Sequence, residues 1–152
     1  MNKAKVIEYL PIAAEALSNV GIVYTDSNNK EAIIKTYRSN ISAFGAAVIN
    51  SGFKPAVAFY AEDADNSDEK PKAGDSEEVK RSKLIRAMYY IVKYDEFKDN
   101  ISALPDAKTI AKNVIKENDF SACNVLHEEF INASIALKLA MNTFVLTKPK
   151  KG

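Results

Sequence analysis

The stretch from Tyr37 to Tyr60 constrains the fold most, because its apolar residues recur with the period of an α-helix. Its large aliphatic and aromatic positions are Ile41, Phe44, Val48 and Ile49. Ser51-Gly52 ends this helix, because glycine readily adopts the left-handed conformation that follows a last turn. The short apolar run 56–60 then predicts a buried second helix of about two turns. The stretch therefore predicts two helices joined by a tight turn.

Gly45 lies in the middle of the first of these helices, where glycine costs about 1 kcal/mol relative to alanine. The small residues Ala43, Ala46 and Ala47 surround it in the sequence. We therefore expect another helix to pack closely against this face, with Gly45 allowing the approach.

The rest of the chain also has helical periodicity. Helices are expected over residues 3–20, 30–51, 77–94, 106–118 and 120–146. The last is the longest and widest in its apolar face, which predicts a position in the centre of a bundle. A loop is favoured over a short hairpin at 22–29, since turn-forming residues fill it. No segment alternates long enough for a central strand. The fold class is therefore all-α, a single domain (1–152) with a bundle of about six helices.

Charge is distributed unevenly along the chain. The net charge is +1, but residues 62–78 carry eight acids and two lysines, which leaves +7 on the remainder. This segment has no apolar residue larger than alanine, which predicts a mobile acidic loop. The tail 147–152 has three lysines and is expected to fray. A basic body with one acidic loop suits a polyanion partner, although a solvated surface explains the charge equally well.

The acidic segment superficially resembles a calcium-binding loop at Asp63, Asp65 and Ser67. The later positions do not fit, since Asp68 stands where the sharp turn needs glycine. Gly74 stands where the bidentate glutamate belongs. The sequence therefore argues against calcium.

Catalytic chemistry has little support in the sequence. Cys123 and His127 lie one turn apart, but they are too few for zinc, and neighbours on one helix seldom share a cleft with a third orienting group. We expect a binding or assembly module with no cofactor and no metal site. An enzyme that uses Cys123 and His127 is the disfavoured alternative. A single cysteine, no signal-peptide core and no membrane span fit a cytoplasmic protein.

Two of the predicted helices carry basic stripes. The first stripe consists of Lys83, Arg86, Tyr90 and Lys93, and the second of Lys108, Lys112 and Lys116. A basic helix face that includes an aromatic residue is typical of a helix lying along a nucleic-acid backbone. A solvated face explains each stripe as well, so the stripes alone leave both interpretations open.

Three motifs along the chain carry a family resemblance. The central motif consists of Tyr37, Ile41, Phe44-Gly45, Ser51-Gly52-Phe53 and Ala56-Val57-Ala58-Phe59. The weaker matches are Tyr9, Leu10, Pro11 and Ala13 near the start, and Ala136, Leu137, Lys138 and Leu139 in the last helix. Their order and spacing resemble the all-helical small subunit of type III-B CRISPR effector complexes, the Cmr small-subunit family.

The resemblance implies a function and a set of partners. Such a subunit would be non-catalytic and would stack head to tail in several copies along the guide RNA and target RNA, beside other subunits of a Cmr-type complex. It would hold the RNA through basic helix faces and would have no membrane partner. Phosphate contacts by lysine and arginine would make binding salt-dependent and largely independent of sequence.

The residues expected to contact nucleic acid are Lys35, Arg38, Lys54, Lys83, Arg86 and Lys112. They are chosen from stripes and charge, and the resemblance supplies only the position of Arg38 beside Tyr37. The residues expected to be structural are Tyr37, Phe44, Gly45, Gly52 and Phe59. The alternative from another class is a helical adaptor that binds only protein, whose lysines serve solubility.

Overall fold

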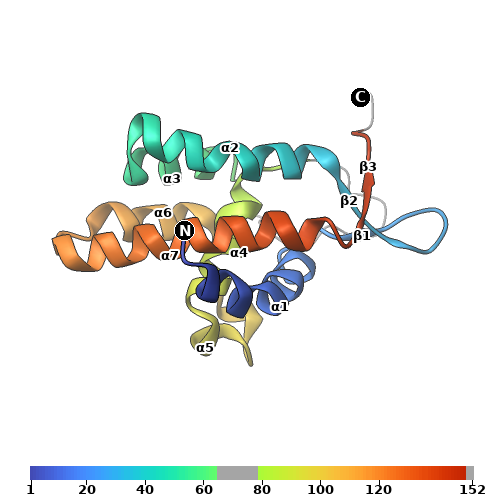
Figure 1. The fold of residues 1–152 in the computed structure, drawn as a ribbon, viewed down its shortest axis with the longest axis horizontal. Coiled ribbons are helices and arrows are strands. Elements are labelled where there is room, and N and C mark those ends of the chain that lie inside the picture. The colour runs from blue at the N-terminus through green and yellow to red at the C-terminus, as the bar shows by residue number, and fades with distance from the viewer. Residues whose placement is uncertain (65–78, 150–152) are drawn as a thin grey trace.

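Helices make up most of the structure, a computed structural model that describes residues 1–64 and 79–149 (Figure 1). The helices are α1 (Lys3–Asn19), α2 (Lys35–Ser51), α3 (Phe53–Ala61), α4 (Ser82–Val92), α5 (Tyr94–Phe97), α6 (Ala107–Lys116) and α7 (Phe120–Met141), with a 3-10 turn at Ile101–Ala103. The strands are β1 (Tyr24–Thr25), β2 (Glu31–Ile34) and β3 (Val145–Thr147). The expected all-α class is confirmed, with one small sheet added. Within these residues, no helix combines the length and apolar content that a membrane crossing requires.

Three helices begin at side-chain caps. The side chains of Asn2, Asp106 and Asp119 each accept a hydrogen bond from the backbone N–H three residues later, at 3.1, 2.8 and 2.9 Å. These bonds satisfy donors that the first turn of a helix otherwise leaves without an intrahelical partner. They fix the starts of α1, α6 and α7.

Gly52 separates α2 from α3, as the sequence predicts. Its φ is +96°, in the region that favours glycine, and its N–H donates to Val48 O at 2.8 Å. The chain reverses there, so that α3 folds back beneath α2 in Figure 1.

Helix α7 lies in the middle of the bundle, as expected, and packs against α1, α2 and α4 (Figure 1). Phe130 and Leu137 on this helix are fully buried. Burying a side chain of that size contributes about 1.5–3 kcal/mol. The buried alanines Ala133, Ala136 and Ala140 let the neighbouring helices approach. This helix therefore organises the core.

A three-stranded sheet replaces the ends of two predicted helices. Strand β2 pairs antiparallel with β1 and parallel with β3, with Ala32 opposite Val145 in the second pair. The prediction of helix at 30–34 was therefore wrong, as was the preference for a loop over a hairpin at 22–29. The predicted last helix was also too long, because the chain leaves α7 at Met141 and enters β3.

The pairing of β2 with β3 also contradicts the expectation that the basic tail frays from residue 147. Thr147 belongs to β3, and its hydroxyl hydrogen-bonds the Tyr24 hydroxyl at 2.6 Å across the sheet. The tail therefore does not begin to fray at 147. Residues 150–152, the rest of the predicted frayed segment, lie outside the described residues.

Asp63 ties α3 to α4. Its two carboxylate oxygens accept hydrogen bonds from the backbone N–H groups of Arg81 and Ser82, at 2.8 and 2.9 Å. Asp63 thus serves the start of α4, which lies later than the predicted start at residue 77. The predicted mobile acidic loop falls mostly on residues 65–78, outside the described residues.

The surface of α2 differs from expectation around Gly45. A Cβ added there would meet nothing within 4 Å, and Ala43 and Ala46 are exposed. Ile49 has 85% of its surface exposed. The expected close helix packing at Gly45 is therefore wrong within the chain, and this small-residue face of α2 is turned to the outside.

Candidate nucleic-acid interface

Lys83 lies inside the molecule and not on a surface stripe. Only 8% of its surface is exposed, and its Nζ donates to the carbonyl oxygen of Gly21 at 3.2 Å. Tyr90 of the same predicted stripe is fully buried, and its hydroxyl donates to the Glu15 carboxylate. Burial, together with Glu15, raises the pKa of Tyr90. The expectation of an exposed basic stripe on α4 was therefore wrong.

Arg86 also binds the protein's own backbone. Its Nε donates to Pro105 O at 3.0 Å and its Nη2 to Leu104 O at 3.2 Å. The pKa of nearby Asp106 lies below its ordinary value, chiefly because the Thr109 N–H donates to it, and also because Arg86 is close. Arg86 thus fixes the loop that precedes α6.

Lys54 closes the C-terminal end of α6. Its Nζ donates to Ile115 O at 3.0 Å and to Glu117 O at 2.7 Å. A cation is favourable there, because the last carbonyls of a helix carry partial negative charge. Lys54 therefore joins α3 to α6.

Arg38 brings the start of α2 to the end of α7. Its Nε donates to Asn142 Oδ1 at 2.8 Å. Lys35 is exposed and lies three residues before Arg38 on α2, and Lys138 lies four residues before Asn142 at the end of α7. Residues at these spacings are neighbours on a helix surface. Lys35, Arg38 and Lys138 therefore form one cationic surface, the α2–α7 patch.

Sequence reasoning missed Lys138 as a member of this patch. Its own helix offers no second cation at helical spacing, because Lys138 is the only lysine or arginine of α7. The neighbour that gives it significance, Arg38, belongs to another helix and is brought close only by the fold.

The α2–α7 patch lies among segments without acidic residues. Residues 35–61 and 130–149 contain no Asp or Glu, although acids are nearly as numerous as bases in the whole chain. Helices α2 and α7 pack against each other, so the two acid-free segments lie together. Charge of one sign on neighbouring elements produces a local positive potential.

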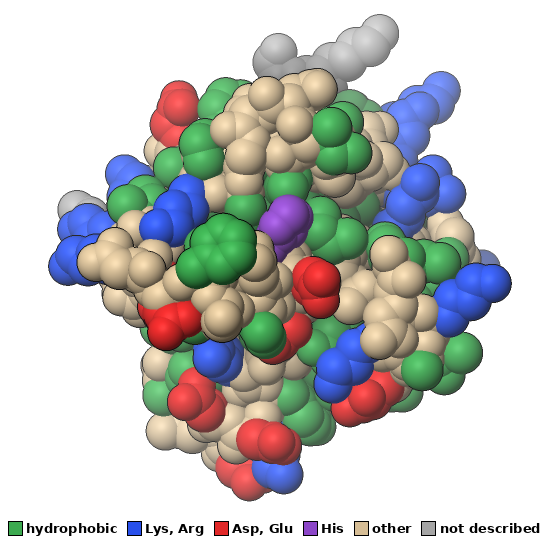
Figure 2. All heavy atoms as spheres, turned by 60° about the vertical axis from the view of Figure 1, so that its left-hand side comes forward, with side chains coloured by type: hydrophobic (Ala, Val, Ile, Leu, Met, Phe, Trp, Pro, Cys, Tyr) green, Lys and Arg blue, Asp and Glu red, His purple; other side chains and the backbone are tan. Residues whose placement is uncertain are grey.

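Lys112 lies on a second basic surface. Lys108, Lys112 and Lys116 are all exposed on α6, which confirms the predicted solvent-facing ridge. Figure 2 shows Lys and Arg side chains toward both sides of the face that it presents, with acidic side chains more frequent in the lower part.

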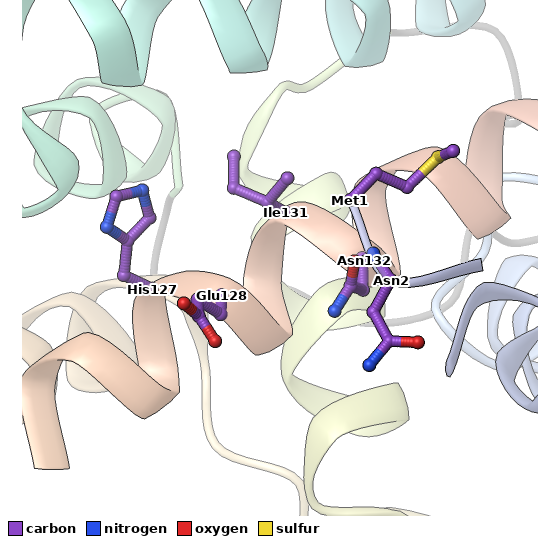
Figure 3. A pocket seen from close by; sticks show the side chains of 6 residues that line it. All are labelled: Met1, Asn2, His127, Glu128, Ile131 and Asn132. Carbon is purple, nitrogen blue, oxygen red and sulfur yellow. Dashed lines mark hydrogen bonds between the residues drawn. The ribbon is translucent and has the colours of Figure 1, made fainter. Parts of the chain in front are cut away.

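His127 lines a cleft of about 400 Å³ beside the N-terminus (Figure 3). Its ring stacks on Phe53, with the ring centroids 5.2 Å apart and the planes at 13°. In Figure 3 its ring and the Glu128 carboxylate point in different directions. Asn132 accepts a hydrogen bond at 3.0 Å from the backbone N–H of Asn2, which holds the N-terminus there.

This arrangement gives His127 a packing role against an aromatic ring. Among residues 1–64 and 79–149, no group of three or more His, Cys, Asp and Glu side chains is placed to hold a metal ion.

A family model described as CRISPR-associated protein (Cas_Cmr5) matches residues 11–141. The matched region extends from α1 to the end of α7 and includes Arg38 and Lys138. No curated protein and no solved structure matches the chain.

Proposed function

Because the chain belongs to the Cas_Cmr5 family of CRISPR-associated proteins and is thereby a Cmr complex subunit, we propose that it is a non-catalytic RNA-stabilising subunit. It stacks in several copies along the guide RNA and target RNA of a type III-B effector complex. Cationic helix faces contact the phosphates.

The observation that carries this proposal is the acid-free setting of the α2–α7 patch. Lys35 and Lys138 each lie one helical turn from the Arg38–Asn142 hydrogen bond, and the surrounding segments 35–61 and 130–149 contain no carboxylate. Such a surface attracts a polyanion and suits phosphate contacts that do not depend on base sequence. Lys35 and Arg38 were predicted from the sequence, and Lys138 now joins them in the proposal.

Three other residues of the predicted set fit this role less well. Lys54, Lys83 and Arg86 each donate to carbonyl oxygens of the chain itself. Their geometry supports a structural task, so the proposal places RNA contact at the α2–α7 patch and at Lys112 on the α6 ridge.

The test measures RNA binding by the full-length protein over a series of salt concentrations, with Lys35→Glu and Arg38→Glu combined. Each phosphate contact contributes about 0.7 to the slope of log affinity against log salt for single strands. The double variant is expected to bind at least roughly tenfold more weakly at low salt, with the slope reduced by about 1.4. Lys3→Glu combined with Lys98→Glu makes the same charge change elsewhere on the surface.

Equal losses in the two double variants would mean that net charge and not the patch governs binding. Absence of RNA binding at every salt concentration would favour the adaptor alternative. The observation that favours the adaptor is the exposure of large apolar residues, with Phe120 79% and Ile49 85% exposed.

Head-to-tail stacking is the second part of the proposal. The end of α2 and the start of α7 lie at one end of the molecule, and the small sheet lies at the other (Figure 1). Each end presents apolar side chains, Ile49 and Phe120 at the first and Val145 and Leu146 at the second. Contact between unlike ends generates a filament and not a closed pair.

A further inference from the structure

Phe59 presents an aromatic ring at the surface of α3. Half of the side chain is exposed (51%), although its neighbour Tyr60 is buried. The guanidinium of Arg81 lies over the Phe59 ring, 4.4 Å from its centroid. The sequence predicts a structural role for Phe59, but the core takes up only part of its surface.

The ring borders a groove between α3 and α6, which lie side by side at the left of Figure 1. The groove has a volume of about 490 Å³. Its lining residues are Ala58, Phe59, Ala61, Glu62, Lys108, Ala111, Lys112 and Ile115. Most of these side chains are apolar, and two exposed lysines of the α6 ridge stand at the edge.

The charges around the groove favour an anionic occupant. Lys108 and Lys112 are one helical turn apart, about 6 Å along the axis of α6. Arg81 adds a third cation over the ring, whereas Glu62 is the acid found among the described residues that line the groove. An aromatic side chain of a partner protein would contact the apolar lining but would bring no negative charge to the lysines.

Single-stranded RNA has bases that match the apolar, aromatic lining of the groove and phosphates that match its lysines. Bases stack on aromatic side chains with little dependence on sequence, and lysines beside the ring hold the backbone. We propose that the α3–α6 groove binds an unpaired nucleotide of single-stranded RNA, its base stacked on Phe59 and its phosphates at Lys108 and Lys112. This inference rests on the proposed function and assigns it a second, structurally distinct contact.

The groove and the α2–α7 patch then differ in what they bind. The patch offers only cations and contacts any phosphate backbone. The groove requires a base that is free to leave its partner strand, so it selects single-stranded over duplex RNA.

The test compares Phe59→Leu with the wild type in binding a short single-stranded RNA and a duplex of the same length, each over a salt series. Loss of stacking is expected to weaken single-strand binding roughly 5- to 100-fold at every salt concentration. The salt slope and duplex binding are expected to stay unchanged. Phe59→Tyr, which keeps the ring, should bind as the wild type does. Ile7→Ala shortens another exposed apolar side chain, on α1 and away from the groove, and should have no effect.

Two further variants test the charge and the groove itself. Lys108→Gln combined with Lys112→Gln should lower the single-strand salt slope by about 1.4. Ala58→Glu places a negative charge in the groove without changing Phe59 and should also weaken single-strand binding. Thermal unfolding of each variant establishes that it is folded.

The outcomes separate this inference from the proposed function. Unchanged single-strand binding by Phe59→Leu, with loss in the Lys35 and Arg38 double variant, overturns the groove and leaves the function standing. Equal effects of Phe59→Leu and Ile7→Ala also overturn it. A wild-type protein that binds neither RNA form at any salt concentration overturns both. Selective loss of single-strand binding in Phe59→Leu supports the groove.

Discussion

The role of a lysine in this protein depends on how far its side chain is buried. Lys35 is exposed at the start of α2, whereas Lys83 is nearly enclosed and its Nζ donates to Gly21 O. A buried charge is tolerated only when it has partners, because loss of hydration is costly. A substitution of Lys83 is therefore expected to change the stability of the fold, and a substitution of Lys35 is expected to change the charge of the surface.

Charge reversal at these two positions is expected to separate stability from binding. Lys83→Glu should lower the free energy of unfolding by more than about 3 kcal/mol, because it places an uncompensated charge inside. Lys35→Glu should stay within about 0.5 kcal/mol of the wild type. Denaturant unfolding measures both. Equal stabilities of the two variants would contradict the buried position of Lys83.

The burial of Lys83 could not be predicted from the spacing of residues along α4. Helical periodicity shows that Lys83 and Tyr90 share a side of the helix, but not what covers that side. The covering groups come from α1 and the turn after it, at Glu15 and Gly21. The ridge on α6 was predictable, because Lys108, Lys112 and Lys116 are all exposed among the described residues.

At the scale of an element, the start of α4 is held by Asp63, a residue far before it in the sequence. Asp63 accepts hydrogen bonds from the N–H groups of Arg81 and Ser82. These groups lie at the start of α4 and have no acceptor within the helix. Asp63→Ala is therefore expected to lower the free energy of unfolding by about 1–2 kcal/mol, the usual cost of a lost helix cap. The exposed Asp99→Ala is the control for loss of one negative charge. If the two variants lose the same stability in denaturant unfolding, Asp63 does not act as a cap.

The elements that the sequence predicted best are those fixed by local pattern. Gly52 ends α2 as expected, and the apolar face of α7 places that helix in the centre. Strand β2 could not be predicted in this way. Ile34 precedes Tyr37 and Ile41 at helical spacing, so Ala32, Ile33 and Ile34 resemble a helix start. They form a strand because β3 arrives from the far end of the chain to pair with them.

For the whole molecule, the proposed stacking depends on its two apolar ends. Replacing Ile49 and Phe120 by serine is expected to lower the average mass in a sedimentation series at increasing protein concentration. The substitutions remove apolar surface that a contact would bury, at about 25 cal/mol per Å². Ile7→Ser changes an isoleucine on α1 that is 66% exposed and serves as the control. A wild-type protein that stays monomeric throughout the series would contradict self-stacking by the isolated chain.

The bond from Asp63 to the start of α4 also has a consequence for how the chain tolerates change in length. It holds the residues on either side of segment 65–78 next to each other, so whatever lies between them closes a ring. The entropy of closing such a ring rises by only about 0.6 kcal/mol for each doubling of its length. A flexible affinity peptide inserted between residues 64 and 79 is therefore expected to lower the free energy of unfolding of the helices only slightly.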